Sequence, residues 1–232
     1  IINQTIFSTA PNDNNKMMTG ELFEVSENTL KVVGLDGHRI AIRNIALEGR
    51  ADDVKVVVPG KTLQEISKIL STDAENMVNV YFTNNHILFE FDDTVVVSRL
   101  IEGEYFRIDQ MLNSDYDTKL TVNKKEMLSC IDRTTMLIKD SDKKPIIIGI
   151  TDHSMEVKLN SAYGSMKEEL AIDKRGKDIM IGFNPKFLID ALRVIDDEMI
   201  NIYMINPKAP CFIRNDEGTY IYLILPVNFN VY

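Results

Sequence analysis

The chain has few of the residues that build covalent or metal-based sites. Among its 232 residues are two cysteines, three histidines and no tryptophan. Cys130 and Cys211 lie far apart, and no histidine stands at metal-ligand spacing from another histidine or a cysteine. This scarcity argues against a disulfide framework and a metal site. It fits a reducing cytoplasm, where we expect both thiols to be buried and without a redox role.

Long apolar runs are also missing. The most apolar stretch, 220–227, is far shorter than the roughly 20 residues that span a bilayer. No signal peptide is recognisable, and a first residue of isoleucine rather than methionine predicts a fragment or a processed product. A charged fraction of 26% beside 44% apolar residues predicts a globular chain of one large domain or two ordinary ones.

Positive charge is in deficit, because 26 Lys and Arg face 35 Asp and Glu and give a net charge of −9. Taken alone, this argues against nucleic acid, since a duplex repels an acidic surface. The three segments with the strongest helical pattern, 60–71, 123–139 and 185–195, nevertheless sum to +4, which leaves −13 for the rest. A mildly basic helical layer could lie near phosphates without reading bases. Ordinary surface variation is an equally good explanation, because Lys and Arg are common helix formers.

An internal repeat is the most informative pattern. Segments 78–84 and 200–206 share Asn, Tyr and Asn at identical spacing, with a constant offset of 122 residues. Upstream, 61–70 and 186–195 each place apolar residues on one helical face, at an offset of 125. The chain therefore contains two copies of one unit.

Strands and a further helix are predicted around these segments. The expected strands are 21–25, 29–34, 39–47, 78–82, 86–91 and 94–100 in the first copy, and 146–151, 154–160, 165–171, 200–205, 211–214 and 220–226 in the second. A helix is expected over 123–138, and 1–7 would be the truncated end of its counterpart. With a connector at 113–117, we predict an α+β fold of two tandem domains, 1–115 and 116–232. Each has an antiparallel sheet on one side and two helices on the other.

Four segments resemble motifs of one bacterial family. They are LDGHRIA at 35–41, SRLIEGEY at 98–105, IGFNPKFL at 181–188 and YLILPV at 222–227. In this order and on a duplicated unit, they resemble the DNA polymerase III beta subunit, the sliding clamp. The resemblance covers the second and third of the family's three domains, and the first domain would be absent.

The resemblance implies a ring-shaped homodimer that encircles double-stranded DNA without reading its sequence, with helices lining the hole and sheets outside. Such a protein is not an enzyme and needs no cofactor. It confers processivity on DNA polymerase III in the cytoplasm, and it docks the polymerase alpha subunit, the clamp loader, other polymerases and repair proteins through short peptides. The predicted DNA-facing residues are Lys61, Lys68, Lys124, Lys125, Arg133, Lys186 and Arg193. The predicted subunit contacts are Met136 and Leu137.

The resemblance also implies a peptide-binding groove. Its residues from the first domain would be Met18, Leu35, Gly37, His38, Arg39, Ile40, Phe106, Gln110 and Met111. Those from the second would be Asn184, Phe187, Lys208, Pro210, Leu223, Leu225, Pro226, Val227 and Asn228. Aliphatic and Met side chains suit an adaptable apolar pocket.

Four positions in or near this groove depart from the family pattern. Leu35 stands for the usual Thr, Phe106 for the usual Pro, Asn228 for a common Arg, and Asn15 for the Arg of some members. These changes make the groove less basic.

Other interpretations compete with the clamp. A cluster of Asp36, His38 and Arg39 could be catalytic, but Asp-Gly is a turn signal and the spacing brings no nucleophile to it. Tyr81 and Tyr203 could stack on bases, although their equivalent positions in apolar strands favour core or sheet packing. A peptide-binding scaffold unrelated to DNA and a metal-dependent nucleic-acid enzyme are the alternative functions.

Overall fold

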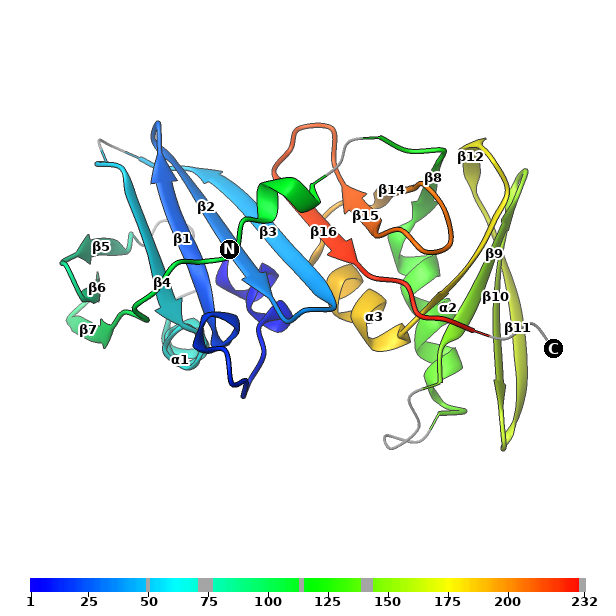
Figure 1. The fold of residues 1–232 in the computed structure, drawn as a ribbon, viewed down its shortest axis with the longest axis horizontal. Helices are drawn as coiled ribbons and strands as arrows, with labels where there is room; N and C mark the ends of the chain where they lie inside the picture. Colours follow the sequence, from blue (N-terminus) through cyan, green and yellow to red (C-terminus); the bar gives the residue numbers. More distant parts are fainter. Residues whose placement is uncertain (49–50, 71–76, 113–114, 139–143, 230–232) are drawn as a thin grey trace. The chain divides into compact units, whose positions relative to one another are not determined.

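The computed structural model describes residues 1–232 except 49–50, 71–76, 113–114, 139–143 and 230–232. The chain divides into two compact units, Ile1–Leu112 and Asn113–Tyr232. Each unit combines antiparallel sheets with helices (Figure 1), so the predicted α+β class with tandem related units is confirmed.

Over its described residues, the first unit contains two antiparallel sheets and one α-helix. Its larger sheet has the strand order β3-β2-β1-β4, and the smaller sheet has the order β5-β6-β7. The bounds are β1 Gly20–Ser26, β2 Thr29–Leu35, β3 Arg39–Ala46, β4 Val54–Pro59, α1 Gly60–Ile69, β5 Asn79–Phe82, β6 His86–Phe91 and β7 Thr94–Arg99. Short 3-10 helices are η1 Ile2–Gln4, η2 Ile6–Ser8, η3 Lys16–Thr19 and η4 Ile108–Met111.

The core of this unit forms where α1 meets both sheets. Alternate residues of β6 point inward, as the strand's period of two requires, and they meet the apolar face of the helix. Leu63 and Ile66 are buried as predicted, and Leu70 packs against the edge of the cluster. The buried cluster comprises Phe23, Val32, Val58, Leu63, Ile66, Ile87, Phe89, Phe91 and Leu100.

The start of the chain differs from the prediction. Residues 1–7 were expected to form the end of an α-helix, but they form the 3-10 helices η1 and η2. Thr5 interrupts the helical backbone with φ −130°, and its hydroxyl donates to the Ile1 carbonyl at 3.0 Å. The Thr9 hydroxyl closes the next turn on the Ile6 carbonyl at 2.8 Å. These local side-chain bonds compete with a continuous helix.

The second unit repeats the plan with two α-helices that lie side by side (Figure 1). Its sheets have the orders β12-β8-β14-β15-β16 and β11-β10-β9-β13, and every pairing is antiparallel. The bounds are β8 Thr118–Asn123, α2 Lys124–Thr135, β9 Ile146–Thr151, β10 Ser154–Ser161, β11 Gly164–Ala171, β12 Asp173–Gly176, β13 Ile179–Phe183, α3 Pro185–Val194, β14 Met199–Met204, β15 Cys211–Arg214 and β16 Tyr220–Ile224.

Both helices of the second unit begin at an asparagine cap. The Asn123 side chain accepts from the N–H groups of Lys125 and Glu126, and the Asn184 side chain accepts from that of Lys186. These bonds satisfy N–H groups that have no partner inside a helix. The predicted helix over 123–138 ends at Thr135 as an α-helix, and residue 139 lies outside the described residues, as do 113–114 of the expected connector.

Candidate functional site

Asp36 closes the turn between β2 and β3. Its Oδ1 accepts hydrogen bonds from the backbone N–H groups of His38 at 3.0 Å and Arg39 at 3.2 Å. Gly37 has a φ of +81°, in the left-handed region that favours glycine. The turn leaves the His38 side chain exposed, while the carboxylate of Asp36 is committed to the turn itself.

Arg39 is held by the first unit. Its Nε donates to Oδ2 of Asp36 at 3.0 Å, and its Nη2 donates to the Phe7 carbonyl at 2.5 Å. Its guanidinium carbon also lies 5.3 Å from the centroid of the Phe7 ring, and the side chain is only 7% exposed. The arginine therefore fastens the 3-10 segment to the turn, and little of its surface is left for a ligand.

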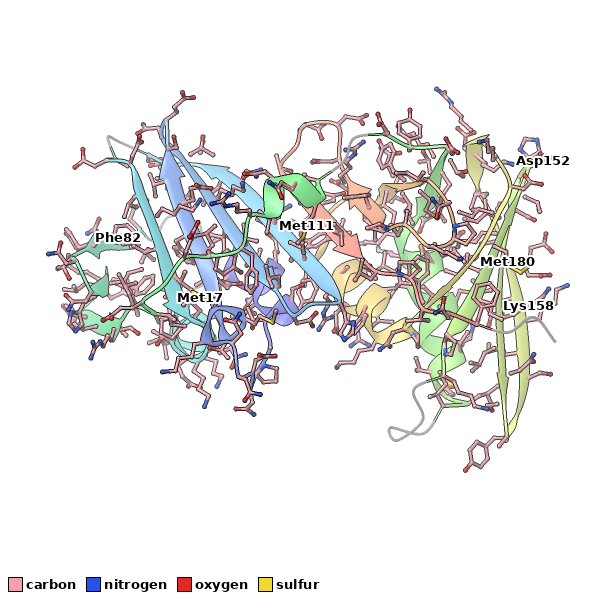
Figure 2. All side chains as sticks on the ribbon, in the orientation of Figure 1. Met17, Phe82, Met111, Asp152, Lys158 and Met180 are labelled. Carbon is pink, nitrogen blue, oxygen red and sulfur yellow. The ribbon has the colours of Figure 1, made fainter. Side chains whose placement is uncertain are left out.

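The other groove candidates of the first unit differ in exposure. Leu35 and Ile40 are register partners across β2 and β3, and both are buried. Met18 is half-buried in η3. Gln110 and Met111 are exposed on η4, where Met111, labelled in Figure 2, has an exposed fraction of 51%. A ligand could therefore touch η4 and the turn directly, whereas Leu35 and Ile40 support the surface from beneath.

Phe106 is braced from behind by an aromatic neighbour. Its ring lies edge-on to that of Tyr105, with 5.7 Å between the centroids. Tyr105 is buried, and its hydroxyl donates to the Val33 carbonyl at 3.1 Å. Burial raises the pKa of this phenol well above its ordinary value, so it stays protonated as a donor. The half-buried Phe106 thus has a fixed support.

The second unit gathers its candidates around β16 and the start of α3. Leu223 is buried in β16, and Leu225, just past the strand, is 36% exposed. Pro226 and Val227 are half-buried, and Asn228 is exposed. The Val227 N–H donates to the Gly182 carbonyl at 2.9 Å, so the segment after β16 is hydrogen-bonded to β13.

Two further polar groups of this unit are already used by the backbone. Asn184 caps α3, so its side-chain oxygen is occupied by the Lys186 N–H at 3.0 Å. Oδ1 of Asn206 accepts from the N–H groups of Lys208 and Ala209 at 2.8 and 3.0 Å. This turn holds Lys208 exposed, and Phe187 is half-buried at the first turn of α3.

The seven basic residues predicted on the helices fall into two groups. Four are engaged by the protein: Lys68 with Glu65 at 2.7 Å, Arg193 with Asp132 at 3.2 Å, Arg133 with Glu168, and Lys124 with the Ile195 carbonyl. The other three, Lys61, Lys125 and Lys186, are exposed, and the described part of the chain gives none of them an ion pair. These three carry most of the charge that the helices can offer to a polyanion.

The remaining sequence predictions have different outcomes. Met136 caps the end of α2 with an exposed fraction of 81%, and Leu137 is half-buried. Tyr203 is buried, as core packing predicted. Tyr81 takes the other predicted alternative, sheet packing. It is 51% exposed, lies opposite Leu88 in the β5–β6 pair, and its hydroxyl donates to Glu90 at 2.9 Å.

The thiols and acidic groups do not form a metal site in the part of the chain that the structure describes. Cys130 and Cys211 are both buried, and burial raises the pKa of each thiol to about 12. No described helix is long and apolar enough to cross a membrane.

Sequence reasoning missed one unusual group, Glu21. Its side chain is fully buried in β1, and neither carboxyl oxygen has a hydrogen-bond partner among the described residues. Desolvation by burial raises the pKa of this acid to about 8. The sequence contained a signal for this burial. Alternate residues of a strand face the same side, and Glu21 alternates with Phe23 and Val25, which are both buried.

Comparison with known proteins places this architecture among replication proteins. Family models described as the central and C-terminal domains of the DNA polymerase III beta subunit match residues 1–106 and 109–228. The beta sliding clamps of Staphylococcus epidermidis and Staphylococcus aureus are each 30% identical over 230 residues, covering 98% of this chain. The chain spans 61% of the length of these curated relatives.

Solved structures agree over both units. A protein assigned as a DNA polymerase III beta subunit from Eubacterium rectale has 69% identity and a TM-score of 0.97, with coverage of 99% of this chain and 62% of that one. The DNA polymerase sliding clamp of Bacillus subtilis has 30% identity and a TM-score of 0.95, with coverage of 99% and 61%.

Proposed function

Because this chain belongs to the DNA polymerase III beta subunit family, we propose that it supplies the central and C-terminal domains of a sliding clamp. In this function a full-length homodimer encircles duplex DNA in the cytoplasm and keeps DNA polymerase III on its template. The observation that carries the proposal is the match of two successive domain models to two successive units. We propose the domain boundaries 1–115 and 116–232.

The contact with DNA would be electrostatic and blind to sequence. Lys61, Lys125 and Lys186 extend from three different helices and lack acidic partners among the described residues. Scattered single cations attract phosphates without holding one register, which permits sliding. The net charge of −9 discourages nucleic acid from binding elsewhere on the chain. Lys68, Arg133 and Arg193 would first have to leave their carboxylates.

Partner proteins would dock through short peptides. In the second unit the candidate contacts are Leu225, Pro226 and Val227, whose apolar side chains are at least partly accessible. In the first unit, His38, Phe106 and Met111 present accessible surface. His38 lies in the turn between β2 and β3, which end and begin next to Leu35 and Ile40. The partners would be the polymerase alpha subunit, the clamp loader, other polymerases and repair proteins. Met136 and Leu137 would contact the second copy of the full-length protein.

We propose no catalytic role for this chain. The alternative cluster of Asp36, His38 and Arg39 is bound up in its own turn, and Arg39 is buried. A nuclease assay with divalent metal distinguishes the possibilities, since a clamp should cleave nothing above background. Sustained metal-dependent cleavage by purified protein would instead favour the enzyme.

The peptide-docking function is tested by placing charge in the candidate pocket. Leu225→Asp should weaken binding of a Q-x-x-[LM]-x-F peptide at least tenfold in fluorescence polarisation, because an ionised carboxylate opposes burial of apolar anchors. Met199→Asp, at a residue that is 52% exposed on β14, is the matched control and should bind as the parent does. Equal affinity of Leu225→Asp and the parent would show that the pocket lies elsewhere.

A further inference from the structure

The segment after β16 lies close to β13 at Gly182. A Cβ atom added there would lie 2.7 Å from the Phe229 ring and 2.8 Å from the Val227 carbonyl oxygen. Both distances are below any ordinary carbon contact, so the approach requires a residue without a side chain. The Val227 N–H closes the contact by donating to the Gly182 carbonyl at 2.9 Å.

Glycine is therefore required at this position because there is no room for a side chain, and not because of its backbone conformation. Gly182 is not among the glycines with positive φ, which means that its backbone is open to any residue. Gly149, in the neighbouring strand β9 of the same sheet, provides the contrast, because a Cβ added there meets nothing within 4 Å. The requirement for glycine at position 182 comes from the segment lying across it.

We infer that Gly182 and Phe229 are positioning residues that fix the backbone of 225–228 in the conformation that binds peptide. This inference rests on the proposed function. It links two of the sequence motifs, since the glycine belongs to IGFNPKFL and the segment continues from YLILPV. Phe229 is half-buried rather than exposed, as expected for a side chain that holds a segment in place.

The physical reason is preorganisation. Residues 225–229 belong to no strand, and within the second unit their backbone has one hydrogen bond, from Val227 to Gly182, among the described residues. A segment with so few bonds would sample many conformations if the ring contact were lost. Each conformation in which Leu225 and Val227 point elsewhere lowers the competent fraction and weakens apparent affinity in proportion.

The first experiment removes the ring. Phe229→Ala should weaken peptide binding about tenfold in fluorescence polarisation, while the melting temperature changes by no more than a few degrees, because the residue lies outside the central core. Phe229→Leu restores apolar bulk and should recover most of the affinity. Parental affinity in Phe229→Ala, or no recovery in Phe229→Leu, would overturn the inference.

The second experiment adds one methyl group to a glycine. Gly182→Ala should lose peptide affinity and accelerate hydrogen exchange at the Val227 amide, because the segment is pushed off the strand. Gly149→Ala adds the same methyl group one strand away and should change neither quantity. Equal behaviour of the two variants would contradict the inference. If Gly182→Ala does not fold, the Phe229 series decides alone.

A double-mutant cycle separates positioning from a general loss of structure. If Phe229 acts through Val227, then Phe229→Ala should cost much less affinity in a Val227→Ala background than in the parent. Strict additivity would mean that the two residues act independently, against the inference. If the parent chain binds no peptide, the proposed function is contradicted. If the parent chain binds peptide and the Phe229 and Gly182 variants bind it equally well, only the positioning role is contradicted.

Discussion

Several polar side chains that look functional in the sequence are used by the fold. Arg39 ties Asp36 to the Phe7 carbonyl, and Asn184 caps a helix. Lys124 donates to the Ile195 carbonyl. In each case the charge or amide satisfies a backbone group or a partner within its unit, as buried polar groups must. The residues left for ligands are apolar side chains, the helix lysines Lys61, Lys125 and Lys186, and exposed polar groups such as Gln110, Lys208 and Asn228.

Glu21 gives the chain a pH dependence opposite to that of an ordinary carboxylate. Its pKa is 4.5 when exposed and about 8 in the fold, since burial disfavours the charged form. The protonated acid therefore stabilises the fold fully below pH 4.5, and that stability is lost as the pH rises to 8, by up to roughly 1.4 kcal/mol per pH unit. Burial and, after it, the charge of Glu21 raise the pKa of the nearby Tyr105.

Replacing this acid isolates the effect. Glu21→Gln should abolish the decline in unfolding free energy between pH 5 and 8, measured by urea denaturation at several pH values. Glu24→Gln, on the same strand but in an exposed ion pair with Lys55, should leave the decline in place. An unchanged pH profile in Glu21→Gln would show that Glu21 is ionised throughout.

At the scale of elements, asparagine caps stabilise the starts of helices and can be predicted from the sequence. Asn123 Oδ1 accepts from the Lys125 and Glu126 N–H groups at 3.0 and 3.2 Å. Asn123→Ala should therefore lower the free energy of unfolding by about 1 kcal/mol. Asn160→Ala, at an exposed position in β10, is the control and should be nearly neutral. A loss of equal size in both variants, measured by urea denaturation, would exclude a capping role.

Strands bounded by turns were predicted from the sequence, whereas strands that lead directly into a helix were not. Strands such as β9 and β15 are bounded by turn residues, and their predicted bounds match the structure. Three of the strands not predicted, β4, β8 and β13, join α1, α2 and α3 with at most one residue between. The signals at these points, Pro59-Gly60, Asn123 and Asn184-Pro185, mark only the helix starts. Because each strand passes into its helix without a loop, the strand pattern does not stand apart from the helical one. The fourth strand that was not predicted, β12, is short, polar and mostly exposed, so its sequence does not show the alternation of apolar and polar residues that identifies a strand.

The candidate site was predictable only through the resemblance. Nothing in the spacing of Leu225 or Val227 distinguishes them from core residues, because exposure is decided by where the chain runs after β16. The Gly182 contact was equally hidden, since it joins residues about forty-five positions apart in the sequence. The family motifs located both segments, and the structure supplied the physical link between them.

At the scale of the whole molecule, charge is distributed unequally. The first unit, 1–112, has a formal charge of −7 and the second, 113–232, has −2, which together make the total of −9. Because two of the three exposed unpaired helix lysines are in the less acidic unit, we expect the second unit to contribute more of the attraction to DNA. Long-range repulsion from the acidic first unit would be screened at physiological salt.

Charge reversal tests this expectation in the full-length protein. Lys125→Glu combined with Lys186→Glu should shorten retention on nicked circular DNA several-fold, with a larger effect at low salt, because fewer phosphate contacts also reduce the salt slope. Lys55→Glu, on the sheet, is the control for a charge reversal outside the helices, to be compared with each single reversal, and should retain parental behaviour. Equal retention by all three proteins would mean that the helices do not face the duplex.

The burial of both thiols makes this chain convenient for fluorescence work. Cys130 and Cys211 are at most 1% exposed, and thiols with a pKa near 12 offer almost no thiolate to a maleimide at neutral pH. A single cysteine introduced at an exposed turn residue such as Asn84 should therefore take one dye while the native pair stays unmodified. The labelled chain could then be used to test the proposed peptide docking without first removing Cys130 and Cys211.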